Sequence, residues 1–75
     1  MVKACLLVKT TPVKAERVVD AAKKFKGVKK AFMAYGRADV VIFVDVKKYE
    51  DVLNITAKVH AIDGVRSTET LIEAW

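Results

Sequence analysis

The first half of the chain passes from a short apolar run to a longer stretch with helical spacing. Residues 2–9 (VKACLLVK) are an apolar run flanked by lysines, with the length and composition of a strand. The next residues, Thr10, Thr11 and Pro12, suit a helix start because Thr is a good N-cap and Pro fits the first helical position. We expect a helix over residues 12–26, with one narrow apolar stripe, that ends at Gly27.

A hairpin is predicted in the middle of the chain. Two β-prone runs, residues 28–35 and 38–46, flank the Gly-containing turn at Gly36 and Arg37. The second run is apolar on both faces from Val40 to Val44, as expected for a strand that is buried on both sides. Helices can cover one face of the sheet, so we expect the sheet of a second subunit to cover the other.

The last part predicts a second helix and a final strand. Residues 47–62 carry a wide apolar arc at helical spacing, although no good N-cap residue precedes them. Asp63 and Gly64 close this helix, and residues 65–75 form the strand. Alternation along a strand then places Thr68, Thr70 and Ile72 on one face, and Ser67, Glu69 and Leu71 on the other.

An internal repeat fixes the expected architecture. The segment Lys26-Gly27-Val28-Lys29 links the first helix to a strand, and Asp63-Gly64-Val65-Arg66 does the same for the second helix. Two right-handed βαβ-type halves joined by a hairpin give a ferredoxin-like α+β fold of βαββαβ order. We expect residues 1–75 to be a single domain with a four-stranded antiparallel sheet and two helices on one face.

Composition favours an oligomer and an intracellular location. The chain of 75 residues is 53% hydrophobic, and a domain this small cannot bury that much apolar surface alone. The net charge of +5 comes from scattered lysines, as on an ordinary solvated surface. Cys5 stands alone, which excludes an intrachain disulfide, and no apolar run is long enough for a signal peptide or a membrane span. We expect a cytoplasmic protein without membrane contact.

Several functions of this fold do not match the residues. RNA binding through a sheet needs a row of stacking aromatics, and the strand over residues 38–46 has only Phe43. A soft-metal site needs paired cysteines, and the single histidine, His60, has no partner ligand nearby and is expected to be a partly buried structural residue. No nucleophile–base pair, carboxylate dyad or phosphate loop is present. We therefore expect no enzyme activity, no metal and no cofactor.

Asp39 is the most conspicuous polar residue, because it opens a strand that is apolar on both faces. One interpretation is a turn residue whose carboxylate accepts hydrogen bonds from the amides of its own hairpin. The other is a polar anchor for a small zwitterion beside the tight turn at Gly36. Thr68 and Thr70 could add hydroxyl groups, or they could be ordinary β-branched strand formers.

These residues carry a family resemblance that spans nearly the whole chain. The set of Gly27-Val28, Gly36-x-x-Asp39, Gly64-Val65 and Thr68-x-Thr70 resembles the C-terminal RAM domain of Lrp/AsnC (feast/famine) transcription regulators. The resemblance implies dimers that pair sheet against sheet in a dimeric α/β-barrel arrangement and assemble further. It also implies an effector, a free amino acid or similar metabolite, bound where dimers meet. The implied ligand-binding residues are Tyr35, Gly36, Arg37, Ala38, Asp39, Thr68 and Thr70.

Two departures from the family pattern bear on function. The chain starts at the first RAM strand without a helix-turn-helix, so we expect no direct sequence-specific DNA contact. It would then act by assembling with itself or with full-length Lrp/AsnC regulators. Many relatives have Arg directly before the first Thr, whereas this chain has Ser67 there and Arg66 one position earlier. The alternatives to an amino-acid sensor are an oligomerisation module without a ligand and a regulatory subunit of a metabolic enzyme.

Overall fold

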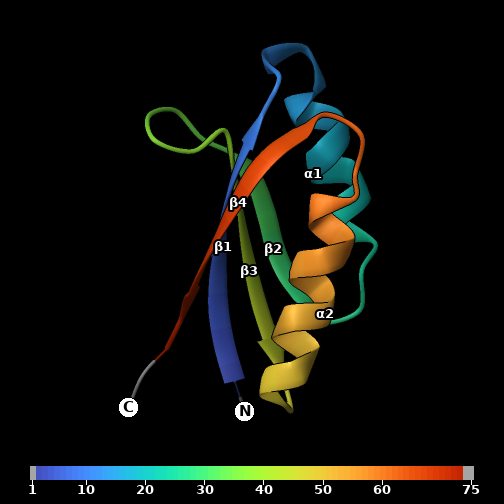
Figure 1. Cartoon of the computed structure of the whole chain (residues 1–75), viewed down its shortest axis with the longest axis vertical. Coiled ribbons are helices and arrows are strands. Elements are labelled where there is room, and N and C mark those ends of the chain that lie inside the picture. The colour runs from blue at the N-terminus through green and yellow to red at the C-terminus, as the bar shows by residue number, and fades with distance from the viewer. Residues whose placement is uncertain (1, 74–75) are drawn as a thin grey trace.

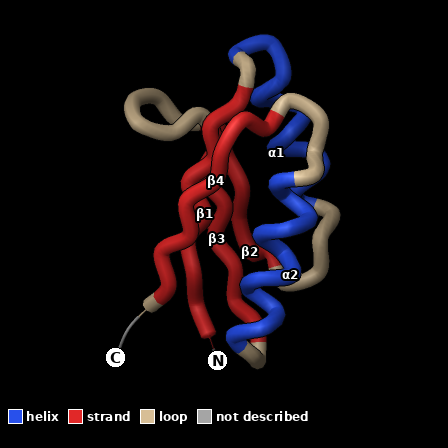
Figure 2. The backbone as a smooth tube through the Cα atoms, viewed as in Figure 1, coloured by secondary structure: helices blue, strands red, loops and turns tan. Residues whose placement is uncertain are grey.

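The computed structural model of the chain describes residues 2–73. Its elements follow the expected βαββαβ order, with strands and helices in two separate layers (Figures 1 and 2). The strands are β1 (Val2–Thr10), β2 (Val28–Met33), β3 (Val40–Val46) and β4 (Val65–Ile72); a 3-10 turn, η1 (Pro12–Lys14), leads into α1 (Ala15–Lys23), and α2 is Tyr49–His60. The sheet order is β2-β3-β1-β4 with antiparallel neighbours throughout. The predicted ferredoxin-like fold is confirmed.

The core lies between the sheet and the two helices. Alternate residues of β1 and β3 point toward the helices, and cross-strand partners such as Leu6 and Ile42 are both fully buried. From the helices, Val18 of α1 and Val52 of α2 are fully buried against this layer. The periodicities of two and 3.6 residues therefore select the side chains that form the core.

The first helix is shorter than the sequence predicts. It begins with η1, and its α-helical part ends at Lys23 rather than Lys26. The amides of Lys24 and Phe25 bond to carbonyls three residues back, which tightens the chain before Gly27 turns it with φ +98°. Thr11 occupies the N-cap position of η1, but its side chain makes no capping hydrogen bond, so the expected Thr cap is wrong.

The hairpin strands, the second helix and the last strand are also shorter than predicted. The hairpin strands end at Met33 and resume at Val40, which leaves a six-residue connection in place of the tight turn expected at Gly36 and Arg37. Helix α2 starts two residues late, where the Asp51 carboxylate accepts a hydrogen bond from the Lys48 amide at 3.3 Å. Strand β4 ends at Ile72, and the last two residues of the predicted strand lie outside the described residues.

The sheet face opposite the helices, called the open face below, carries apolar side chains in contact with solvent. It presents Cys5 and Leu7 from β1, Val41 and Phe43 from β3, and Leu71 from β4. Phe43 is 42% exposed and Leu71 49%. Figure 1 shows both helices on the other side of the sheet, so neither covers this face.

Candidate functional site

The connection between β2 and β3 projects from the sheet on the side away from the helices (Figure 1). At its tip, Tyr35 is fully exposed, and Gly36 has φ +112°, a backbone conformation that favours glycine. No atom lies within 4 Å of the place where a Cβ of Gly36 would be, so the tip is open. Arg37 is exposed, whereas Ala38 is buried where the chain returns to the sheet.

Asp39 is fixed by three hydrogen bonds at the base of this connection. Its backbone N–H donates to the Val8 carbonyl at 2.9 Å, and its carbonyl accepts from the Ala34 amide at 2.9 Å. Its carboxylate Oδ2 accepts from the backbone N–H of Thr10 at 2.9 Å. The carboxylate thus accepts an amide hydrogen bond, but the donor lies at the end of β1 and not within the hairpin. The position of Asp39 is set by its backbone as well as its side chain.

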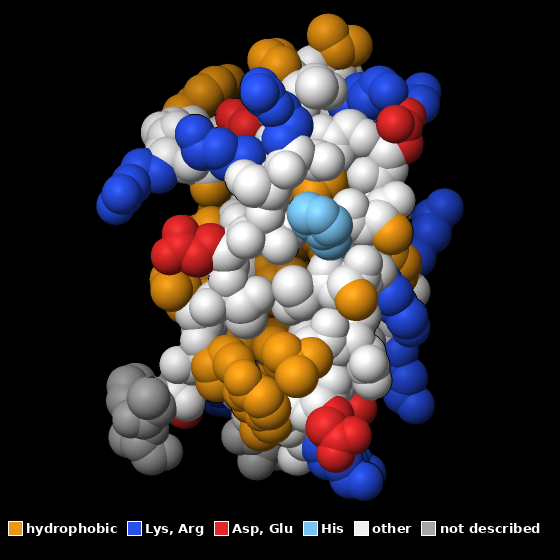
Figure 3. Space-filling view, in the orientation of Figure 1, with side chains coloured by type: hydrophobic (Ala, Val, Ile, Leu, Met, Phe, Trp, Pro, Cys, Tyr) orange, Lys and Arg blue, Asp and Glu red, His pale blue; other side chains and the backbone are white. Residues whose placement is uncertain are grey.

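A hollow of about 480 Å³ lies beside this carboxylate. It is lined by Lys9, Thr10, Pro12, Asp39, Arg66 and Ser67. Two cationic residues and two hydroxyl-bearing residues, Thr10 and Ser67, therefore share the hollow with the Asp39 carboxylate. Figure 3 shows basic side chains gathered at this end of the molecule. An arrangement with both charge signs suits a small ligand that carries both an ammonium and a carboxylate group.

Arg66 and Ser67 reach the same hollow because the pairing of β1 with β4 is irregular. Lys9 pairs with Ser67, but Thr10 pairs with Val65, which leaves Arg66 at a bulge. Consecutive residues at a bulge are not held on strictly opposite faces. The sequence indicated Arg66 and Ser67 only as a departure from the family pattern, and it gave no signal for Lys9.

Thr68 and Thr70 lie on the face of the sheet that the helices cover. They pair with Val8 and Leu6, which are fully buried beneath the helices. The Thr56 hydroxyl donates to the Val52 carbonyl at 2.9 Å and lies 3.1 Å from the Thr70 hydroxyl. Because each hydroxyl has one hydrogen, Thr70 is the donor to Thr56. Within one subunit these two threonines do not line the hollow beside Asp39, and their part in ligand binding stays a prediction.

Other candidate chemistry is sparse in the described part of the chain. Residues 2–73 contain no group of three or more His, Cys, Asp or Glu side chains that could hold a metal ion. His60 is exposed at the end of α2, as the pale-blue group of Figure 3 shows, so its expected partial burial is wrong. Within residues 2–73, no helix has the length and apolar character needed to cross a membrane.

Burial raises the pKa of the Cys5 thiol on the open face.

Comparison with solved structures supports the same assignment of fold. A protein from Thermus thermophilus superposes with a TM-score of 0.95 at 22% identity, covering 100% of this chain and 95% of that one. A hypothetical protein from Pyrococcus horikoshii gives 0.88 at 28% identity, covering 100% and 92%. Escherichia coli AsnC gives 0.89 at 20% identity, and the match covers 99% of this chain but only 51% of AsnC.

Sequence comparison identifies the family. No curated protein sequence matches this chain significantly. The family model described as the Lrp/AsnC ligand binding domain, however, matches residues 3–73, which is nearly the whole chain. The observed order of strands and helices agrees with that match. The chain therefore belongs to the Lrp/AsnC ligand-binding domain family.

Proposed function

We propose that this chain is a regulatory subunit that binds a free amino acid, or a similar small zwitterion, beside Asp39 and couples that binding to its own assembly. The observation that carries the proposal is the hollow at the Asp39 turn, where one fixed carboxylate faces Lys9 and Arg66. Its volume of about 480 Å³ lies within the range of about 300–1,000 Å³ that small-molecule sites usually have.

Each part of the hollow has a role in this proposal. The Asp39 carboxylate receives the ammonium group of the ligand through the oxygen that does not bond to Thr10. The ligand carboxylate lies against Lys9 and Arg66, whereas Gly36 to Ala38 do not line the hollow within one subunit. Tyr35, fully exposed at the tip, contacts a neighbouring copy and closes the site from outside. Thr68 and Thr70 belong to the site only where another copy contributes them.

The apolar open face supports the assembly part of the proposal. A face with Phe43 and Leu71 in solvent is costly for an isolated subunit, and a second copy of the same sheet would cover it. A ligand shifts assembly only through different affinities for the separate and assembled states. A ligand held between copies meets this condition. The assembly would then act on transcription, either by itself or together with full-length Lrp/AsnC regulators.

The same open face favours a second candidate, an oligomerisation module that binds no metabolite. Titration calorimetry against each of the twenty amino acids, at a protein concentration where the chain is assembled, separates the two. A saturable heat with one or a few amino acids, lost in Asp39→Asn but kept in the surface control Asp20→Asn, supports the sensor. Heat that persists in Asp39→Asn assigns the ligand to another site. No heat from any amino acid favours the oligomerisation module.

A further inference from the structure

The internal repeat of the sequence gives the structure two equivalent corners. The two halves of the fold are β1-α1-β2 and β3-α2-β4, and in each half a glycine turn leads from the helix into an edge strand. The Gly64 carbonyl accepts a hydrogen bond from the Thr11 amide, just past the end of β1, at 3.0 Å. The Gly27 carbonyl likewise accepts one from the Asp45 amide, near the end of β3, at 3.0 Å. Each glycine turn is therefore fixed to the end of the first strand of the opposite half.

Each corner also places a cationic residue at a bulge. Arg66 lies at the bulge between β1 and β4 and lines the hollow beside Asp39. In the other corner the register of β2 against β3 shifts between Val28 and Lys30, which leaves Lys29 at a bulge. Bulges redirect side chains and are common beside functional sites. The hollow beside Asp39 thus has a structural equivalent beside Lys29.

This equivalent, called the lysine hollow below, has a volume of about 520 Å³ and lies between the α1–β2 turn and one side of α2. Its charged residues are Lys26, Lys29, Lys47, Lys58, Asp45 and Asp51. Four lysines and two aspartates leave an excess of two positive charges. Figure 3 shows basic side chains in a row down the side of the molecule where Figure 1 places the connection from α1 to β2.

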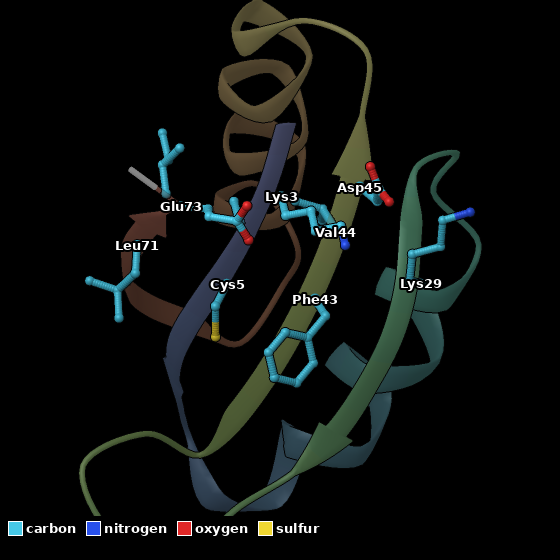
Figure 4. A pocket seen from close by; sticks show the side chains of 10 residues that line it. Lys3, Cys5, Lys29, Phe43, Val44, Asp45, Leu71 and Glu73 are labelled. Carbon is cyan, nitrogen blue, oxygen red and sulfur yellow. The ribbon is translucent and has the colours of Figure 1, made fainter. Parts of the chain in front are cut away.

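The four lysines are not held in ion pairs within the described part of the chain, where the ion pair found joins η1 to the α2–β4 turn. Lys29 and Asp45 lie on neighbouring strands, yet Figure 4 shows the Lys29 side chain extending away from Asp45, past the edge strand β2. The Asp51 carboxylate accepts its hydrogen bond from the Lys48 amide. A hollow lined mainly by one sign of charge concentrates ions of the opposite sign. The lysine hollow is therefore suited to an anion.

Packing fixes the backbone of the turn that carries Lys26. A Cβ on Gly27 would lie 2.7 Å from Val46 Cγ1 and 3.0 Å from Ile55 Cδ1, so the turn sits directly against the end of β3 and the side of α2. This close approach and the hydrogen bond to the Asp45 amide hold the two walls of the hollow together. A backbone that is already in place lowers the ordering cost of binding.

We propose that the lysine hollow is a second ligand site, which binds a small molecule with a diphosphate or triphosphate group. Lysine ammonium groups are common phosphate ligands, and several of them around one hollow suit a group with several negative charges. The volume of about 520 Å³ lies within the range of about 300–1,000 Å³ that is usual for small-molecule sites. Asn54 also lines the hollow, and its amide offers donors and an acceptor to the uncharged part of the ligand.

The lysine hollow is separate from the proposed amino-acid site. Asp39 and Asp45 lie near opposite ends of β3, about 20 Å apart at about 3.3 Å per residue. The two hollows share no lining residue. The carboxylates of Asp45 and Asp51 in the lysine hollow would repel a nucleic-acid backbone that ran along it, which favours a small ligand seated on the lysines.

The test is titration calorimetry of the full chain with inorganic pyrophosphate, triphosphate and ATP, at about 0.15 M salt. At least one probe is expected to bind saturably, and the double variant Lys29→Gln with Lys58→Gln is expected to raise its dissociation constant by roughly tenfold or more. The matched control, Arg17→Gln with Lys23→Gln, removes two charges from exposed positions on α1 that do not line the hollow. It should change the dissociation constant by less than about twofold.

Four outcomes would overturn the lysine hollow as a phosphate site. One is equal weakening by both double variants, which would show attraction to net charge alone. Another is the absence of saturable binding of every phosphate probe, whatever the amino-acid titrations show. Weakening by Arg66→Gln in place of the lysine variants would assign the anion to the hollow beside Asp39. A short DNA duplex that binds where the small phosphates do not would assign the lysines to nucleic acid. Circular dichroism shows whether each variant remains folded.

Discussion

The backbone N–H of Thr10 donates to the Asp39 carboxylate over 2.9 Å, joining the end of β1 to the start of β3. The same carboxylate faces the hollow with Lys9 and Arg66. A single side chain therefore supports the fold and is available to a ligand. This double role means that a loss of ligand binding in a variant of Asp39 has to be separated from a loss of stability.

Asp39→Ala is expected to lower the free energy of unfolding by about 1–3 kcal/mol, because the partly buried Thr10 amide loses a charged acceptor. Asp39→Asn should lose less, since its amide oxygen can still accept that hydrogen bond. Urea denaturation of both variants measures the difference. Equal losses in the two variants would show that the Thr10–Asp39 hydrogen bond contributes through the charge alone.

Leu6→Ala should be among the most destabilising changes, since Leu6 is fully buried between Ile42 and Thr70 on its two neighbouring strands. Large-to-small changes at such positions cost about 2–5 kcal/mol, against a total of about 4–11 kcal/mol for a domain of this size. Leu53→Ala, at an exposed site on α2, is the matched control and should change stability by less than about 1 kcal/mol. Thermal unfolding of both variants at one concentration tests the contrast.

Two glycine substitutions separate backbone strain from steric clash. Gly27 and Gly36 both have positive φ, so alanine is strained at either position. A Cβ on Gly27 would lie 2.7 Å from Val46 Cγ1 and 3.0 Å from Ile55 Cδ1, whereas nothing lies near Gly36. We expect Gly36→Ala to cost about 1–2 kcal/mol and Gly27→Ala roughly 2–4 kcal/mol by urea denaturation. Similar losses of unfolding free energy in the two variants would mean that the side chains around Gly27 move to accommodate the added methyl group.

The fold could be predicted from the sequence because its signals are local. Alternation in β1 and β3 selects the buried partners Leu6 and Ile42, and Gly27 and Gly64 mark the two helix ends with positive φ. The element boundaries were predicted less well, since the ends of α1 and the hairpin depend on hydrogen bonds that composition does not encode. Helices in general draw much of their stability from tertiary packing, which also sets where they end.

The candidate site was predicted only in part, because it is built from distant residues. The Gly36–Asp39 connection is visible in the sequence, but the donor to Asp39 lies 29 residues away at Thr10. The bulge that brings Arg66 into the hollow depends on how β4 pairs with β1. Likewise, Phe32 and Phe43 lie with ring centroids 6.0 Å apart on the open face, which only the pairing of their strands reveals.

The ion pair between Lys14 and Asp63 predicts a weak acid dependence of stability. The Lys14 ammonium donates a hydrogen bond to Asp63 at 2.7 Å, and this bond together with its positive charge holds the pKa of the carboxyl below its ordinary value. A lowered pKa in the folded state stabilises the protein above the ordinary value of about 3.9, and this contribution is lost as pH falls through the folded pKa. Lys14→Met should therefore show a shallower fall of Tm than wild type below about pH 4. Because Asp63 is exposed, about 1 M salt should remove most of the difference. Identical acid profiles at low salt would show that the pair does not contribute.

Cys5 offers a probe of the open face that needs no variant to detect assembly. Burial raises the pKa of its thiol, so less thiolate is present at about pH 8 than for a free cysteine, and alkylation should be slower. In the proposed assembly a second copy covers the open face, so the rate constant for iodoacetamide should fall further as protein concentration rises. Alkylation of the wild type at one rate across a concentration range in which it passes from monomer to dimer would place Cys5 outside the interface.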